Sequence, residues 1–169
     1  MPQPRRLILL RHAHARPARA GEDDRDRPLS DTGEAEADAA AKFLADHAPF
    51  ARVLCSPALR TRQTCERVLG QLGYADTRHD ERIYEASAGE LIAVLDEHDA
   101  SPLLLVGHNP GLEQLVALLC TGRSGEYRDA ARRHAAVLPR SPGTWRRATG
   151  CVLVALSTRC AGSCSLHSP

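Results

Sequence analysis

The sequence lacks any apolar run long enough to cross a membrane or to form the core of a signal peptide. Only four apolar residues, Leu7–Leu10, follow the initial segment Met1–Arg6. A signal peptide needs an apolar stretch of about 7 to 15 residues, and a membrane helix needs about 20. We therefore expect a cytoplasmic protein with no membrane partner.

An excess of charge of one sign is also missing. Lysine and arginine together number 22 and aspartate and glutamate 21, which gives a formal net charge of +1. Proteins that bind nucleic acids or acidic membranes through bulk electrostatics carry a clear positive excess. The composition therefore predicts no nucleic-acid partner, and any site for an anion has to be local.

The cysteine pattern lacks the pairs that are typical of a zinc site. The six cysteines, at positions 55, 65, 120, 151, 160 and 164, include no Cys-x-x-Cys pair. We expect reduced thiols that pack mostly as small buried side chains. His14 follows His12 by two residues, but no third ligand has a suitable spacing and neighbouring arginines would oppose a metal ion. We predict no metal and no other cofactor.

The length and composition are those of one domain. A chain of 169 residues with 43% hydrophobic residues can close a core without disulfides or metals. We expect a single domain over residues 1–161 and a flexible tail over 162–169. The polar segment Ala13–Pro28 should be exposed and mobile. We expect its arginines to form salt bridges in solvent rather than a recognition patch: Arg16, Arg19, Arg25 and Arg27.

Short apolar runs alternate with helical patterns along the chain. Strands are expected at residues 7–10, 53–55 and 103–106, with weaker candidates at 76–79 and 151–156. Helices should begin at Ser30, at Ser56, at the Ser87–Glu90 capping box and after Pro110. This alternation predicts an α/β fold, a three-layer sandwich with a mostly parallel central sheet.

The first two helices allow more specific expectations. The first should run to about His47 and bury an apolar stripe at helical spacing, made of Ala35, Ala39, Phe43 and Leu44. In the second, Ser56 should be the cap and Pro57 the first helical residue, and the helix should run to about Leu72.

Three polar clusters follow three of the predicted strands. Arg11 and His12 follow the first, residues 56–60 follow the second, and Gly107–Asn109 follow the strand at 103–106. Ligands of open α/β sheets bind at the edge where the carboxyl ends of parallel strands meet. Either His12 or His108 taken alone would be an ordinary surface histidine, but together with the arginines they indicate one site.

Arg60 indicates that the ligand of this site is an anion. It falls in the first turn of the second helix, where the helix dipole disfavours a cation by a few tenths of a kcal/mol up to about 1 kcal/mol. A bound anion would remove that conflict. A guanidinium group matches the oxygens of a phosphate with two parallel hydrogen bonds, so Arg11 and Arg60 with helix N-termini predict a phosphate site.

Four ordered motifs resemble those of the histidine phosphatase superfamily. Leu10–Ala13 resembles its Arg-His-Gly signature, with Ala13 in the place where glycine is commonest. The other three are Arg27–Gly33, the Ser-Pro-x-x-Arg-Ala-x-Gln-Thr-like Ser56–Thr64, and Val106–Gly111. The resemblance covers residues 6 to 127 and implies a phosphoglycerate mutase-like fold. Chain length, Tyr84–Glu90 and Gly107–Gly111 are most similar to SixA-type phosphohistidine phosphatases.

The resemblance implies roles for individual residues. His12 would be the phosphorylated nucleophile, and Arg11, Arg60 and His108 would bind the transferred phosphoryl group. Glu85 aligns with the position that supplies a proton donor in the wider superfamily, and a solvated loop carboxylate is an equally good interpretation of it. No metal would be required, because phosphoryl transfer depends mainly on positioning and charge stabilisation.

The resemblance leaves three functions open. The leading one is a phosphohistidine phosphatase acting on a phosphorylated protein, such as a histidine phosphotransfer domain in signal transduction. The second is a broad phosphomonoesterase acting on small phosphorylated molecules, and the third is a non-catalytic phosphate-binding module. Residues 130–169 depart from the family pattern, which indicates either an unusual extension or a damaged reading frame.

Overall fold

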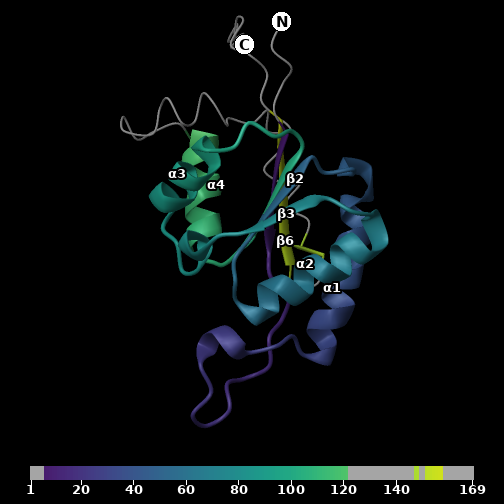
Figure 1. Cartoon of the computed structure of the whole chain (residues 1–169), viewed down its shortest axis with the longest axis vertical. Helices are drawn as coiled ribbons and strands as arrows, with labels where there is room; N and C mark the ends of the chain where they lie inside the picture. Colours follow the sequence, from purple (N-terminus) through teal and green to yellow (C-terminus); the bar gives the residue numbers. More distant parts are fainter. Residues whose placement is uncertain (1–5, 122–146, 149–150, 158–169) are drawn as a thin grey trace, which may run out of the picture.

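A six-stranded sheet lies at the centre of the computed structural model, which describes residues 6–121, 147–148 and 151–157 (Figure 1). Its order is β3-β2-β4-β1-β6-β5. The strands are β1 (Arg6–Arg11), β2 (Arg52–Cys55), β3 (Asp76–His79), β4 (Leu103–Gly107), β5 (Arg147–Ala148) and β6 (Cys151–Ser157). The first four are parallel, and β6 runs antiparallel to both β1 and β5. All five predicted strands are therefore confirmed.

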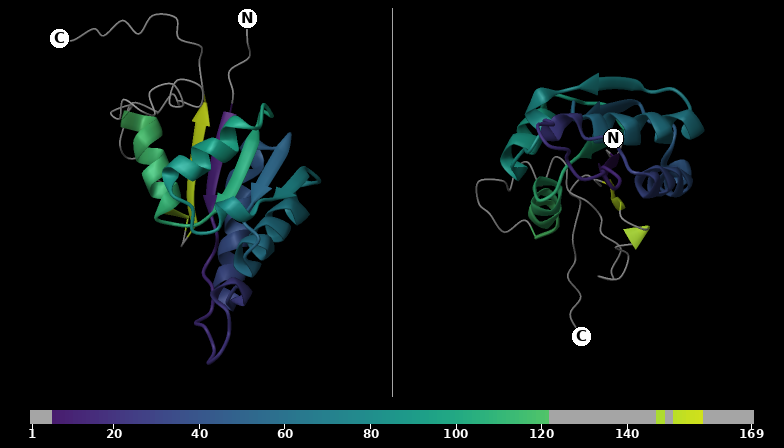
Figure 2. Two further views of the ribbon diagram at one scale, coloured as in Figure 1. Left: turned by 60° about the vertical axis from the view of Figure 1, so that its left-hand side comes forward. Right: turned by 90° about the horizontal axis from the view of Figure 1, so that it is seen from below.

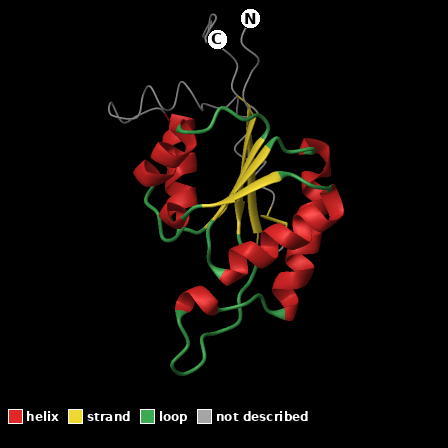
Figure 3. Cartoon of the chain, in the orientation of Figure 1, coloured by secondary structure: helices red, strands yellow, loops and turns green. Residues whose placement is uncertain are grey.

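Helices cover both faces of this sheet. α1 (Asp31–Leu44) and α2 (Leu59–Leu72) lie on one face, and α3 (Ala88–Asp96) and α4 (Gly111–Thr121) lie on the other (Figures 2 and 3). Three short 3-10 helices are η1 (Asp24–Asp26), η2 (Ala45–His47) and η3 (Glu81–Ile83). The predicted three-layer α/β sandwich is confirmed. The predicted tail, 162–169, lies outside the described residues, so the domain limits stay a prediction.

The two cores explain why the strands are apolar throughout. Leu7 and Leu9 of β1 pack with α3 and α4, whereas Ile8 and Leu10 pack with α1 and α2. Successive side chains of a strand point to opposite faces, so a strand covered on both sides needs an unbroken apolar run.

No helix in the described ranges is long and apolar enough to span a membrane.

The face that α1 buries differs from the prediction. Ser30 caps the helix as expected, because its Oγ accepts a hydrogen bond from the Gly33 N–H at 3.1 Å. Ala35 is exposed, however, and Phe43 is 39% exposed. The buried apolar residues are Ala37, Ala40, Ala41 and Leu44. The helix is rich in alanine on two faces, so spacing alone could not tell which one packs against the sheet.

The start of α2 was also predicted wrongly. The helix begins at Leu59, and Ala58 stands at the cap without a side-chain hydrogen bond. The Ser56 Oγ lies instead 2.7 Å from Nε2 of His108. Ser56 thus bonds to the residue that follows β4 instead of capping α2. Arg60 still lies in the first turn.

The segment between β1 and α1 is only partly exposed. Ala13 and Ala15 are buried, and the rest extends beyond the sheet edge to which the strands β1, β2 and β4 point (Figure 2). Three of the four arginines named above, Arg16, Arg25 and Arg27, form the expected salt bridges. Arg16 pairs with Glu22, Arg25 with Glu81 at 2.7 Å, and Arg27 with Asp24 at 2.7 Å.

Replacing Gly33 tests how tightly α1 holds this segment. A Cβ at Gly33 would lie 2.0 Å from the carbonyl oxygen of His14, so Gly33→Ala should lower the free energy of unfolding by about 1 to 3 kcal/mol, as overpacking does. Gly70→Ala is the control, because beyond the adjacent backbone of α2 and its two chain neighbours no heavy atom lies within 4 Å of its Cβ position. It should be neutral or stabilise α2 by up to about 1 kcal/mol. Urea unfolding measures both, and equal effects would contradict the packing argument.

Candidate active site

The polar clusters meet at the carboxyl edge of the sheet because the strand pairing continues past the strand ends. The His12 N–H donates to the carbonyl of Gly107 at 3.1 Å, and the Ser56 N–H donates to that of Val106 at 3.1 Å. These bonds align the segments that follow β1, β2 and β4. The ring centroids of His12 and His108 are consequently 5.1 Å apart.

The hydrogen bonds of His12 fix where its proton lies. Nδ1 is 2.8 Å from the carbonyl oxygen of Ala13, which can only accept, so Nδ1 carries the proton. Nε2 accepts from Nε of Arg60 at 3.3 Å. Burial, assisted by Arg60, lowers the pKa of His12 from its usual 6.5 to about 4. His12 is therefore a neutral imidazole with its Nε2 lone pair directed at Arg60.

Arg60 joins the two histidines. Its side chain is only 7% exposed, and its Nη2 lies 3.5 Å from Nδ1 of His108. The Nε and Nη2 atoms belong to the same edge of the guanidinium group. That edge therefore spans His12 and His108, and it can offer two parallel hydrogen bonds to oxygens of a phosphoryl group.

His108 is held on its other side by Ser56. Because Nδ1 faces an arginine, which can only donate, the proton of the neutral ring belongs on Nε2, 2.7 Å from the Ser56 Oγ. Burial, followed by the nearby His12 and Arg60, lowers the pKa of His108 to about 3. The ring of Tyr84 meets it edge-on with centroids 5.4 Å apart.

Arg11 and Asn109 carry buried polar atoms that lack partners. Arg11 is the last residue of β1, and its charge contributes to the lowered pKa of both His12 and His108. Within the described part of the chain, Nε of Arg11 and Oδ1 of Asn109 have no hydrogen-bond partner. A buried donor without a partner costs about 1 to 3 kcal/mol. An oxyanion beside Arg11 would remove that cost.

Glu85 is not joined to the cluster. Its side chain is exposed, its φ is +52°, and no hydrogen bond or ion pair among the described residues links it to His12, Arg60 or His108. A left-handed conformation is uncommon for a residue other than glycine. Glu85 nevertheless follows Tyr84 directly and raises the pKa of that tyrosine, behind burial and Asp24. It therefore lies at the rim of the site.

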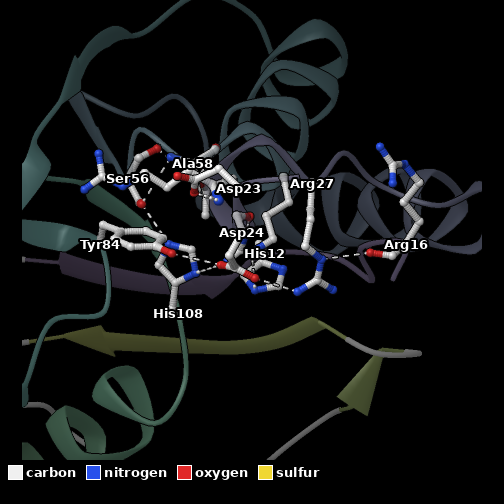
Figure 4. A network of polar contacts seen from close by, with 12 residues as sticks. His12, Arg16, Asp23, Asp24, Arg27, Ser56, Ala58, Tyr84 and His108 are labelled. Atoms are coloured by element: carbon white, nitrogen blue, oxygen red, sulfur yellow. Dashed lines mark hydrogen bonds and ion pairs between the residues drawn. The ribbon is translucent and has the colours of Figure 1, made fainter. Parts of the chain in front are cut away.

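Sequence reasoning missed Asp24, Ser56 as the partner of His108, and Tyr84. The Asp24 carboxylate accepts from Nη2 of Arg60 at 2.8 Å. Arg27 and Tyr84 approach it from opposite sides (Figure 4), with bonds of 2.7 and 2.9 Å. Nothing in a loop of mixed charge distinguishes Asp24 from the other aspartates beside it. Ser56 had a signal, since it lies in the cluster after β2, and so did Tyr84, which begins the segment Tyr84–Glu90 that resembles SixA-type phosphatases.

The described ranges contain no group of three or more histidine, cysteine or acidic side chains that could hold a metal ion. The charges in contact with His12 and His108 are instead those of arginines, with Asp24 as their counter-ion.

The protonation of His12 can be measured directly. We expect the nitrogen NMR shifts of its ring to show a neutral imidazole with the proton on Nδ1 from pH 8 down to about 5, and a midpoint near 4. In the urea-unfolded chain the histidines should titrate near 6.5. Because the folded state then binds fewer protons between these values, stability should fall as the pH falls from about 6.5 to 4. A folded midpoint at or above 6.5 would contradict the burial argument.

Known proteins share this arrangement of strands and helices. Residues 7–101 match the model of the histidine phosphatase superfamily (branch 1). An uncharacterized chloroplastic protein of Arabidopsis thaliana is 32% identical over 157 residues, which are 85% of this chain and 70% of that protein.

Two solved structures are similar as well. SixA from Agrobacterium tumefaciens is 28% identical, with a TM-score of 0.65 over 89% of this chain and 90% of its own. The protein histidine phosphatase SixA complexed with tungstate is 30% identical, with a TM-score of 0.57 over 70% of this chain and 79% of its own. With more than half of its residues matched by the family model, the chain belongs to the histidine phosphatase superfamily (branch 1) and is a histidine-dependent phosphatase with the phosphoglycerate mutase-like fold.

Proposed function

We propose that this phosphatase hydrolyses phosphohistidine on a protein, with His12 as the residue that carries the phosphoryl group in a covalent intermediate. The observation that carries the proposal is the neutral His12, whose Nε2 lone pair faces the guanidinium of Arg60 at 3.3 Å. A neutral imidazole beside a fixed cation is a nucleophile placed next to a group that binds phosphoryl oxygens.

The reaction would take place in two displacements. In the first, the Nε2 lone pair of His12 forms a bond to phosphorus while the P–N bond of the substrate breaks. Because the other nitrogen of the phosphohistidine ring carries a proton, the ring keeps that electron pair and leaves as a neutral imidazole. In the second, water attacks phosphorus, the bond to Nε2 breaks, and inorganic phosphate leaves with neutral His12 restored.

Arg11, Arg60 and His108 would stabilise the charge on the equatorial oxygens. Arg60 presents two N–H groups on its Nε–Nη2 edge, and Arg11 has a buried Nε without a partner among the described residues. A bound dianion would favour protonation of His108 at Nδ1, which faces Arg60, and so supply a further donor. Before an anion binds, both histidines are neutral, so the arginines are the cations that face it.

We favour phosphohistidine as the substrate because of the protonation state of the carboxylate at the site. Asp24 is the carboxylate that contacts Arg60, and its hydrogen bonds from Arg27 and Tyr84 hold its pKa far below the usual range. It cannot donate a proton near neutral pH. An imidazole leaving group is weakly basic and needs little help, whereas an alkoxide needs a general acid. The tungstate complex of the similar protein histidine phosphatase SixA supports a tetrahedral oxyanion site here as well.

The phosphorylated partner would be a protein such as a histidine phosphotransfer domain of a signalling relay. We propose a cytoplasmic location for this protein, although the similar protein of Arabidopsis thaliana is chloroplastic. A small phosphorylated molecule is the second candidate, and the position of Glu85 at the rim beside Tyr84 favours it. The two candidates differ in whether an acid is needed.

Replacing His12 tests the covalent step. His12→Ala should abolish both turnover and labelling by a 32P-phosphorylated substrate, because it removes the Nε2 lone pair that faces Nε of Arg60 and that would attack phosphorus. His14→Ala is the control, since His14 is exposed and bonds to Ser30 at 2.7 Å. It should keep labelling. Wild-type labelling of His12→Ala would overturn the nucleophile, and a wild-type protein without any labelling would indicate a binding module.

Replacing Glu85 separates the two substrate classes. Glu85→Gln removes the proton but keeps size and hydrogen bonding. General acid catalysis is typically worth about 10² to 10⁴ in rate, so a donor at Glu85 would make this variant lose far more activity on an alkyl phosphate than on phosphohistidine. We expect losses below about threefold on both, consistent with an exposed side chain. Large and equal losses would show that Glu85 acts on water or on the pocket instead.

A further inference from the structure

The hydrogen bonds of Arg60 divide its guanidinium group into two halves. On the side of the histidines, Nε donates to His12 and one Nη2 hydrogen faces His108. On the other side, Nη1 donates to the backbone carbonyl of Asp24 at 2.6 Å, and Nη2 donates to its Oδ2 at 2.8 Å. Backbone and side chain of one residue thus hold the half of Arg60 that the histidines do not contact.

Asp24 is itself held in place from two directions. Nη1 of Arg27 donates to Oδ1 at 2.7 Å, and the Tyr84 hydroxyl donates to Oδ2 at 2.9 Å (Figure 4). The Tyr84 ring also meets His108 edge-on. The aspartate therefore links Arg60 to the segment before α1 and to the segment after η3, and three bonds fix the orientation of its carboxylate.

We propose that Asp24 is a positioning residue, which aims the Nε–Nη2 edge of Arg60 at the phosphoryl group between His12 and His108. This inference rests on the proposed function, and it concerns how the site reaches its reactive geometry. Without Asp24 the guanidinium group could rotate about its last bonds, and its two donors would no longer be directed together at the same pair of oxygens.

The arrangement distinguishes a positioning residue from an anion that competes with substrate. A competing carboxylate would occupy the Nε–Nη2 edge, where a phosphoryl group would bind. Asp24 instead takes Nη1 and the outer Nη2 hydrogen, and leaves the edge between the histidines to other partners. Its negative charge also offsets the unfavourable position of Arg60 in the first turn of α2.

The test is Asp24→Asn, which keeps the shape and removes the charge. We expect kcat to fall by about tenfold to a hundredfold, since small misplacements of a catalytic group have effects of this size. Affinity for inorganic phosphate, measured as its inhibition constant, should stay the same or improve, because a negative charge has left the site. Slower turnover without weaker phosphate binding is a result that general loss of structure does not produce.

Asp26→Asn is the matched control, since Asp26 is an exposed aspartate in the same 3-10 turn. It should keep kcat within twofold of wild type. Tyr84→Phe, which removes one bond to Asp24 and keeps the ring, should lower kcat by a smaller factor. If Asp24→Asn does not fold, kcat and the phosphate inhibition constant of Tyr84→Phe test the positioning role in the same way.

A wild-type protein that neither hydrolyses nor becomes labelled by phosphohistidine or p-nitrophenyl phosphate would refute the proposed function, and not this inference. With an active wild type, a kcat of Asp24→Asn equal to that of Asp26→Asn would overturn the positioning role. So would a higher kcat, which would show a competing anion, or a parallel loss of kcat, phosphate affinity and melting temperature.

Discussion

The site depends on a buried cation at the start of a helix. Arg60 is 6% exposed and lies in the first turn of α2, where both burial and the helix dipole disfavour a positive charge. The protein stabilises it with the backbone carbonyl and carboxylate of Asp24. This requirement explains why the segment between β1 and α1, which is polar and of mixed charge, folds back toward the sheet edge.

Neutral histidines are the second consequence of that cation. Both His12 and His108 accept a hydrogen bond from Arg60 and use their other nitrogen on a fixed partner, Ala13 or Ser56. Protonating either ring would place a further positive charge beside a buried arginine, and burial has already lowered both pKa values. The same interaction therefore keeps Nε2 of His12 unprotonated, as the proposed nucleophile requires, and leaves room for the negative charge of a phosphoryl group.

Close backbone contacts place these groups. Gly33 allows α1 to approach the His14 carbonyl, and Gly111 allows α4 to approach that of Ala86, because a Cβ would lie 2.0 Å from either oxygen. The first contact fixes the chain just after His12, and the second fixes the segment that carries Tyr84 and Glu85. The helices thus set the positions of the loops that complete the site.

The sequence by itself determined the strands, the layers and the edge at which the site would form. Unbroken apolar runs such as Leu103–Val106 can only be buried on both faces, and parallel strands bring the residues that follow them together. Arg60 was recognisable because a cation in a first helical turn needs an anion. The local sequence pattern was therefore enough to predict a feature wherever burial or helix electrostatics allowed only one arrangement.

Tertiary structure alone decided which residues pack together and which side chains bond to one another at the site. Which alanine face of α1 is buried depends on α2 and the sheet, and Ser56 does not cap α2 because its Oγ bonds to His108, which follows β4. Asp24 is one of several aspartates in its loop, and only the place where that loop meets Arg60 and Tyr84 selects it. These choices depend on contacts between residues far apart in the chain, which periodicity and capping cannot express because they describe neighbours in sequence.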